Sequence, residues 1–176
     1  MVDGLNHFPS IVVWVPFNEA WGQFNAREVG EWLQSYDHTR LVDAASGWFD
    51  QGSGDIHSIH VYVGPKMPAK ERERALALSE FGGLGYKINR HLWQEKKLFA
   101  YRMVKDEKHL TTWYLSLMEQ LLHLKRKGLC AAIYTELTDV EYEINGFMTY
   151  DRDVLKMDPE RISEAHRKLI ADNELL

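Results

Sequence analysis

Five short runs of apolar and β-branched residues divide the chain and predict its strands. They are IVVWVPF from Ile11, LVDAA from Leu41, DIHSIHVY from Asp55, ALALSEF from Ala75 and LCAAIYTEL from Leu129. The first, fourth and fifth runs show little alternation with polar residues, which is typical of strands covered on both faces in a parallel sheet. We therefore expect five strands, three of them buried on both sides.

Helical patterns lie between several of these runs. The predicted helices begin near Asn25, near Glu107 and at Asp158-Pro159. Asn25 and Glu28 have the spacing of a capping box, and Gly128 is a suitable stop for the second helix. Residues 46–54 are too rich in glycine for a helix, and residues 64–74 have room for only a turn or two. This order predicts an α/β fold with parallel strands.

Composition narrows the classes of protein that fit. The chain has 176 residues, 45% of them apolar, and a formal charge of −5, which suits one ordinary globular domain and gives no basic surface for nucleic acid. No apolar run approaches the roughly 20 residues that span a bilayer, so we expect no membrane partner. The N-terminal MVDGLNHF has no pattern of a secretion signal, and localisation stays unassigned.

Metal and cysteine chemistry are not expected. The eight histidines are scattered without an H-E-x-x-H motif, so we predict no catalytic metal and no cofactor. Cys130 is the only cysteine and excludes an internal disulfide. Because it lies within an apolar run, we expect a buried and inert thiol.

Two glutamates stand where predicted apolar strands end. Glu19 closes IVVWVPFNE, and Glu80 precedes Phe81-Gly82-Gly83. A carboxylate at an apolar wall is partly desolvated and can act as a general acid, whereas glycines let a ligand approach the second carboxylate closely. Two such groups about 5 Å apart would serve a retaining glycosidase. The pattern fits equally well a Glu19 that only caps the strand or pairs with an arginine.

The amino-acid sequence of these segments resembles that of a known family. NHFPSIVVWVPFNEAWGQF is similar to the NHPSI-x-x-W-x-x-x-NE signature of glycoside hydrolase family 2, and SEFGG to its nucleophile strand. DIHSIHVYVGP and IYTELTDVEYEINGFMTYDR resemble the sixth and eighth barrel strands of that family. The resemblance implies that residues 1–176 are the C-terminal part of a (β/α)8 TIM barrel, strands 4 to 8. It also implies a retaining β-glycosidase, closest to β-galactosidases, acting on a β-linked oligosaccharide or glycoside.

The resemblance also assigns roles. It makes Glu19 the general acid/base and Glu80 the nucleophile, gives Asn18 a hydrogen bond to the sugar 2-hydroxyl, and lets Tyr62 steady the charge of Glu80. His60 stands where relatives have Asn or His, and either contacts the sugar or Glu80 or is structural. The expected substrate-binding set is Asn18, His60, Tyr62, Trp21, Trp48, Tyr134 and Glu136.

Several side chains remain open on sequence grounds. Glu136 departs from the YTQLTD of many relatives and adds a third acid near the predicted site. Asp139, Glu141 and Glu143 favour a solvated loop over a cation site. Aromatic faces can cover the apolar faces of sugars, so Trp21 and Trp48 are expected at ligand, whereas packing is expected for Trp14, Trp32, Trp93 and Trp113.

A closed β/α barrel needs eight strands and about 250 residues, and five strands are predicted here. The resemblance implies that strands 1 to 3 are absent, which leaves strand edges at residues 11–17 and 129–135 for self-association or for the missing N-terminal half. We expect little activity from the chain alone. Two alternatives stay open: a non-catalytic carbohydrate-binding remnant, and a structural half that needs complementation.

Overall fold

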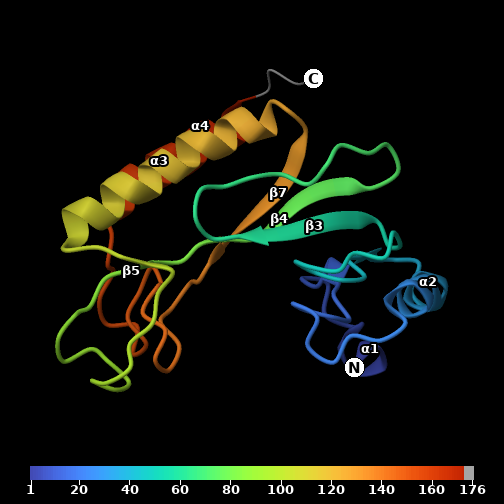
Figure 1. Cartoon of the computed structure of the whole chain (residues 1–176), viewed down its shortest axis with the longest axis horizontal. Helices are drawn as coiled ribbons and strands as arrows, with labels where there is room; N and C mark the ends of the chain where they lie inside the picture. The colour runs from blue at the N-terminus through green and yellow to red at the C-terminus, as the bar shows by residue number, and fades with distance from the viewer. Residues whose placement is uncertain (173–176) are drawn as a thin grey trace. The chain divides into compact units, whose positions relative to one another are not determined.

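The computed structural model of the protein describes residues 1–172. Within that range it is an α/β structure with four helices (Figure 1). They are α1 (Val2–Leu5), α2 (Ala26–Tyr36), α3 (Glu107–Lys125) and α4 (Pro159–Ala171). In the described part of the chain, none of these helices has the length and apolar character needed to cross a membrane.

Each of the five predicted apolar runs contains a strand. They are β1 (Val13–Trp14), β2 (Leu41–Val42), β3 (Ile56–Val61), β4 (Ala75–Gly82) and β7 (Leu129–Thr135). β1 pairs with β2 in parallel, with Val13 opposite Leu41. The longest three strands form one sheet in the order β3-β4-β7.

Two strands were not expected from the sequence. β5 (Leu84–Gly85) and β6 (Arg102–Met103) pair in parallel. Each has only two residues, which is too short for a period to be visible. The predicted α/β class with parallel strands is confirmed, and no sheet among residues 1–172 closes into a barrel.

The chain forms two compact units. Among the described residues, the first comprises residues 1–60, 67–79 and 129–131, and the second comprises residues 61–66, 80–128 and 132–172. The division runs through β3, β4 and β7, so each of these strands contributes residues to both units.

The core of the first unit forms on the apolar face of α2. Leu33 packs with Trp14, Val42 and Ala44, and Ala26 packs with Phe17 and Ala45 in an adjoining cluster. Leu33 and Ala26 are seven residues apart, which places them on one face of the helix. The indole of Trp14 donates to Asp37 just past the end of α2, over 2.7 Å. Strands β1 and β2 are therefore held to the helix at both of its ends.

The second unit contains the helix pair α3 and α4, which pack side by side (Figure 1). The hydroxyl of Tyr114 on α3 lies 2.6 Å from Nε2 of His166 on α4. The predicted cap of α4 is confirmed, because the Asp158 carboxylate accepts from the N–H groups of Glu160 and Arg161. The predicted stop of α3 at Gly128 also holds, with φ at +110°.

Several local predictions were wrong. α2 begins after Asn25 as expected, yet the Asn25 side chain makes no capping hydrogen bond, because its backbone is left-handed with φ at 41°. Residues 64–74 contain no helix. The first and fifth runs are not covered on both faces, since Val12 and Val15 are exposed in the first and residues 130–133 of β7 are exposed in the fifth. Cys130 is therefore exposed, against the expected buried thiol.

The tryptophans divide differently from the sequence expectation. Trp14 is buried as predicted, but Trp32 and Trp93 are exposed. Trp32 stacks on Tyr36 along the outer face of α2, and Trp93 meets Tyr150 edge-on. Both rings thus obtain an aromatic neighbour while remaining at the surface. Helical spacing identified the apolar residues of α2, but it did not show that the face with Leu33 is buried while the face with Trp32 is exposed.

The core of the first unit makes a direct prediction about stability. Leu33 is 2% exposed and Trp32 is 56% exposed. Leu33→Ala should lower the free energy of unfolding by roughly 2 to 5 kcal/mol, because it leaves a cavity beneath α2. Trp32→Ala, the matched control on the next residue, should change it by less than about 1 kcal/mol. Urea unfolding followed by circular dichroism measures both, and equal losses would contradict the assigned helix face.

Candidate active site

In the first unit, Glu19 stands at a tightly held chain turn after β1. Asn18 bridges Ser46 in parallel, and the Glu19 N–H donates to the Ser46 carbonyl over 3.0 Å. The Ser46 N–H in turn donates to the Phe17 carbonyl over 2.9 Å. Glu19 and the following Ala20 both have left-handed backbones, with φ of 53° and 63°. Such strain in side-chain-bearing residues is concentrated at functional sites in proteins.

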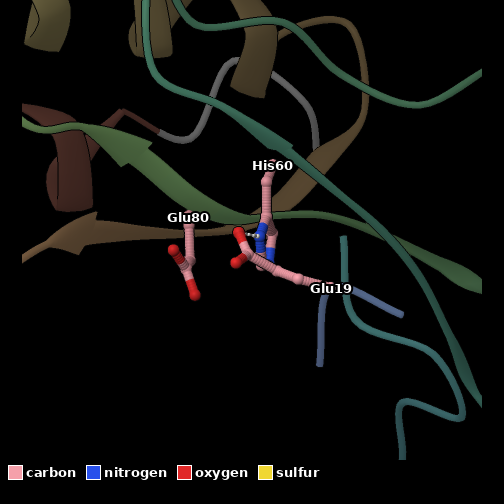
Figure 2. A group of neighbouring side chains, drawn as sticks. All are labelled: Glu19, His60 and Glu80. Carbon is pink, nitrogen blue, oxygen red and sulfur yellow. Dashed lines mark hydrogen bonds and ion pairs between the residues drawn. The ribbon is translucent and has the colours of Figure 1, made fainter. Parts of the chain in front are cut away.

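The Glu19 carboxylate meets the ring of His60, which projects from β3 (Figure 2). Nδ1 of His60 lies 2.7 Å from Oε1 of Glu19, and Nε2 lies 3.1 Å from the Ser46 hydroxyl. The histidine side chain is fully buried, whereas that of Glu19 is 20% exposed. The sequence placed His60 at the sugar or at Glu80; the structure adds a contact with Glu19 that was not expected.

Gly47 makes the position of this imidazole possible. A Cβ atom at Gly47 would lie 2.7 Å from Cγ and Nδ1 of His60, and the residue has φ at +94°. Any side chain here would both strain the backbone and displace the ring. Glycine at position 47 therefore leaves the space that the His60 ring occupies.

In the second unit, Glu80 lies on β4 and is held by two hydroxyl groups. Tyr62 donates to Oε2 of Glu80 over 2.7 Å, and Thr135 of β7 lies 3.4 Å from the same oxygen. The Tyr62 ring stacks on Tyr101, with centroids 3.5 Å apart and planes 5° apart. The hydroxyl that reaches Glu80 is thereby carried by a ring whose orientation is fixed. Thr135 and Tyr101 were not in the predicted site.

The glycines after Glu80 accommodate an aromatic ring of the protein itself. A Cβ at Gly82, where φ is +91°, would lie 2.2 Å from Cε2 of Tyr134. The Tyr134 hydroxyl accepts from the Leu84 N–H over 3.1 Å, and its ring packs edge-on against Phe81. Burial raises the pKa of Tyr134. Tyr134 was expected at the sugar, and the structure gives it a packing role beside β4.

Glu136, the additional acid, is partly buried in the second unit. Its burial, and after that the charges of Glu143 and Asp139, raise the pKa of Glu136 to about 7. Its Oε1 atom is buried and has no hydrogen-bond partner among the described residues. A carboxyl group in this setting exchanges its proton near neutral pH.

The acidic run after β7 was expected to be a solvated loop, and this was wrong for its first member. Asp139 is buried and accepts from Nζ of Lys156 over 2.6 Å and from the Gly146 N–H over 2.8 Å. Lys156 is fully buried and also donates to the Ile144 carbonyl over 2.8 Å. The available signal was the position of Lys156 between Leu155 and Met157, an unusual place for a charge.

The aromatic residues expected to contact ligand are at the surface of the first unit. Trp21 is 82% exposed and Trp48 is 46% exposed, and Asn18 is exposed as well. The loops that carry the two tryptophans are tied together, because the Gln23 side chain donates to the Phe49 carbonyl over 2.9 Å. The exposed indoles are accessible to a ligand, and their contact with a sugar stays a prediction.

Comparison with known proteins adds no assignment: no protein-family model matches this sequence, and no match was found among curated proteins. The similarity to glycoside hydrolase family 2 therefore rests on the short segments quoted above. The geometry defines two polar clusters, Glu19 with His60 in the first unit and Glu80 with Tyr62 in the second.

The raised pKa of Glu136 predicts a stability that depends on pH. Between its ordinary value of 4.5 and about 7, the folded state holds more protons than the unfolded state, so stability falls as pH rises through this range. Because water screens a partly exposed group, we expect the effect to be on the order of 1 kcal/mol.

Glu136→Gln should remove this contribution. The free energy of unfolding of the variant, measured relative to that of the parent protein, should therefore be higher at pH 8 than at pH 5. Urea unfolding of both proteins at the two pH values gives the comparison. Glu141→Gln, at an exposed acid of the same loop, is the control and should leave the pH dependence unchanged. A pH dependence that survives in Glu136→Gln would assign it to another group.

Proposed function

We propose that this chain is the catalytic part of a retaining β-glycosidase of the glycoside hydrolase family 2 type, closest to β-galactosidases. The observation that carries the proposal is a pair of glutamates, one in the turn that follows β1 and one near the C-terminal end of β4, each held by a polar side chain. Glu19 is held by His60, and Glu80 is held by Tyr62. A structural glutamate needs neither a strained backbone nor a dedicated phenol.

The fold proposed for this function is strands 4 to 8 of a (β/α)8 barrel. In chain order the five long apolar runs correspond to β1, β2, β3, β4 and β7. The parallel pairing of β1 with β2 supports the proposal, as do the helices that follow β1 and precede and follow β7. In such barrels the chemistry belongs to the C-terminal ends of the strands, where Glu19 and Glu80 occur.

In the first chemical step, Glu80 attacks the anomeric carbon while Glu19 gives its proton to the departing glycosidic oxygen. A covalent glycosyl ester of Glu80 and a free alcohol result. In the second step Glu19 takes a proton from water, and the resulting hydroxide displaces Glu80 from the sugar. The configuration at the anomeric carbon is retained because it is inverted twice.

Tyr62 supports the nucleophile in this scheme. Its hydroxyl donates to Oε2 of Glu80, which stabilises the carboxylate before attack and after release. Oε1 is then the oxygen assigned to the anomeric carbon. Asn18 is assigned to the sugar 2-hydroxyl, and Trp21 and Trp48 to the apolar faces of the substrate.

One specific observation favours a second candidate, a carbohydrate-binding protein without turnover. The indoles of Trp21 and Trp48 are exposed on two linked loops, and aromatic faces bind sugars through contact area alone. Calorimetric binding of β-linked oligosaccharides by the chain, with no hydrolysis of any aryl β-glycoside even after complementation with the remaining barrel strands, would support this candidate instead.

The nucleophile can be identified by covalent trapping. In a form of the chain complemented with the remaining barrel strands, a panel of 2-deoxy-2-fluoro β-glycosides with dinitrophenolate leaving groups should glycosylate Glu80. The fluorine slows both steps, whereas the activated leaving group speeds only the first, so the covalent intermediate accumulates. Peptide mass spectrometry should find the sugar on the Glu80 peptide, and Glu80→Gln should lose the label. Glu141→Gln, at an exposed acid outside the predicted site, is the matched control and should keep it. A label on Glu136 would overturn the assignment.

The acid/base role of Glu19 predicts a dependence on the leaving group. In the same complemented form, Glu19→Ala should reduce kcat/KM by about 10² to 10⁴-fold for alkyl or sugar leaving groups, because these need a proton. Dinitrophenyl glycosides need none and should be much less affected in the first step. Added azide should restore turnover and yield a β-glycosyl azide. Uniform losses across leaving groups, without azide rescue, would assign Glu19 a structural role.

A further inference from the structure

Four large aromatic side chains are exposed on two loops of the first unit. Trp21 and Phe24 follow Glu19, and 82% and 64% of their surfaces are exposed. Trp48 and Phe49 lie in the loop that follows β2 and are 46% and 71% exposed. Single exposed apolar residues are ordinary, whereas a group of large ones on linked loops is typical of a binding surface. The two loops therefore mark a candidate surface for a ligand.

Both loops adjoin the candidate acid/base. The N–H of Trp21 donates to the Asn18 carbonyl over 3.0 Å, which closes the turn that contains Glu19. In the other loop, the centroid of the Trp48 ring lies 6.1 Å from that of His60, and Nδ1 of His60 lies 2.7 Å from Oε1 of Glu19. One tryptophan therefore belongs to the turn that carries Glu19, and the other lies near a residue in contact with Glu19.

Polar contacts hold the loop that follows β2 in place. Arg74 donates to both carboxylate oxygens of Asp50, over 2.7 and 2.8 Å, and forms a further ion pair with Glu71 at 2.8 Å. The side-chain amide of Gln23 donates to the Phe49 carbonyl over 2.9 Å, which joins the two aromatic loops. Because these contacts order the loops in advance, a ligand binds there with a smaller loss of conformational entropy.

The exposure of these aromatic rings indicates which part of a substrate they suit. A glycosidase that removes one terminal sugar encloses that sugar, because exclusion of bulk water strengthens the electrostatic interactions at the reacting bond. The leaving group extends away from the bond that Glu19 would protonate and can continue into solvent. Aromatic faces at the surface therefore suit the sugars of the leaving group, whose apolar faces they can cover.

We propose that the exposed aromatic side chains of the two loops form a platform for the leaving-group sugars of a β-linked oligosaccharide. The members of this aromatic platform are Trp21, Phe24, Trp48 and Phe49. The substrate class is then an oligosaccharide, rather than a glycoside with a small leaving group. The assignment to the leaving-group side rests on the proposed glycosidase function, whereas binding of sugars to the platform can be tested without turnover.

Contacts on the aromatic platform contribute to catalysis as well as to affinity. Binding energy from parts of a substrate that do not react can be used to orient the reacting bond, so truncated substrates lose kcat as well as affinity. A substrate with a long sugar leaving group should therefore be hydrolysed with a higher kcat/KM than one with a short leaving group of similar reactivity. That advantage should depend on the exposed rings.

Isothermal titration calorimetry tests the aromatic platform in the isolated chain without turnover. The probes are the β-linked tetrasaccharides cellotetraose, xylotetraose, mannotetraose and galactotetraose. At least one of them should bind to the parent chain. Trp21→Ala and Phe49→Ala, one variant from each loop, should each raise its Kd about tenfold or more, because large aromatic contacts are often the main sources of binding energy.

Trp32→Ala is the matched control, because Trp32 is 56% exposed in the same unit but lies on α2. It should leave the Kd unchanged. Urea unfolding of all three variants should closely match that of the parent protein, since each replaced side chain is exposed, and this separates a lost contact from lost folding. No binding of any tetrasaccharide by the parent chain, or an equal loss of affinity in Trp32→Ala, would overturn the proposal.

Kinetics in the complemented form separate this inference from the proposed function. The two substrates share a terminal β-galactosyl group, which is attached to cellotriose in one and to nitrophenol in the other. Trp21→Ala should lower kcat/KM about tenfold more for the first substrate than for the second. Equal losses for both would overturn the platform and retain the glycosidase. Turnover of neither substrate, combined with binding that depends on Trp21, would refute the glycosidase function and the leaving-group assignment and retain a sugar-binding surface.

Discussion

A buried imidazole needs a hydrogen-bond partner at each nitrogen, and the candidate site of the first unit is arranged around that need. Ser46 meets it on one side with its hydroxyl, while its backbone holds the turn that carries Glu19. Glu19 meets it on the other side. One serine thus couples the position of the ring to the position of the carboxylate, because an unpaired polar group in this place would cost free energy.

In the second unit, aromatic rings hold the carboxylate of Glu80 in place. Glu80 receives a phenol hydrogen bond from Tyr62, and the stacked ring of Tyr101 limits the motion of that phenol. Farther along the chain, Lys156 and Asp139 form a buried ion pair. Removing either partner of such a pair leaves an uncompensated buried charge, so the two side chains hold their segments together. The pair is weak evidence for net stability, because burying both charges also costs free energy.

Local sequence patterns were sufficient for the five longer apolar strands and the three main helices, but not for the two-residue strands β5 and β6 or for exposure. The strands, the α4 cap at Asp158 and the end of α3 at Gly128 followed from short-range chemistry. Trp32 and Cys130 were misplaced because whether an apolar face is covered depends on which element packs there. The same limit hid Asp139, whose partner Lys156 is 17 residues away.

The sequence by itself determined the α/β class and the candidate residues Glu19 and Glu80, since these follow from apolar runs and what stands at their ends. Tyr62 and His60 became candidates only through the resemblance to a family. Only the tertiary structure decided how they are held. Ser46, Ser79, Tyr101 and Gly47 act through contacts between segments that are far apart in the chain. Such contacts leave no periodic trace in a single sequence, because a hydroxyl or a glycine gains its role from the ring that packs against it.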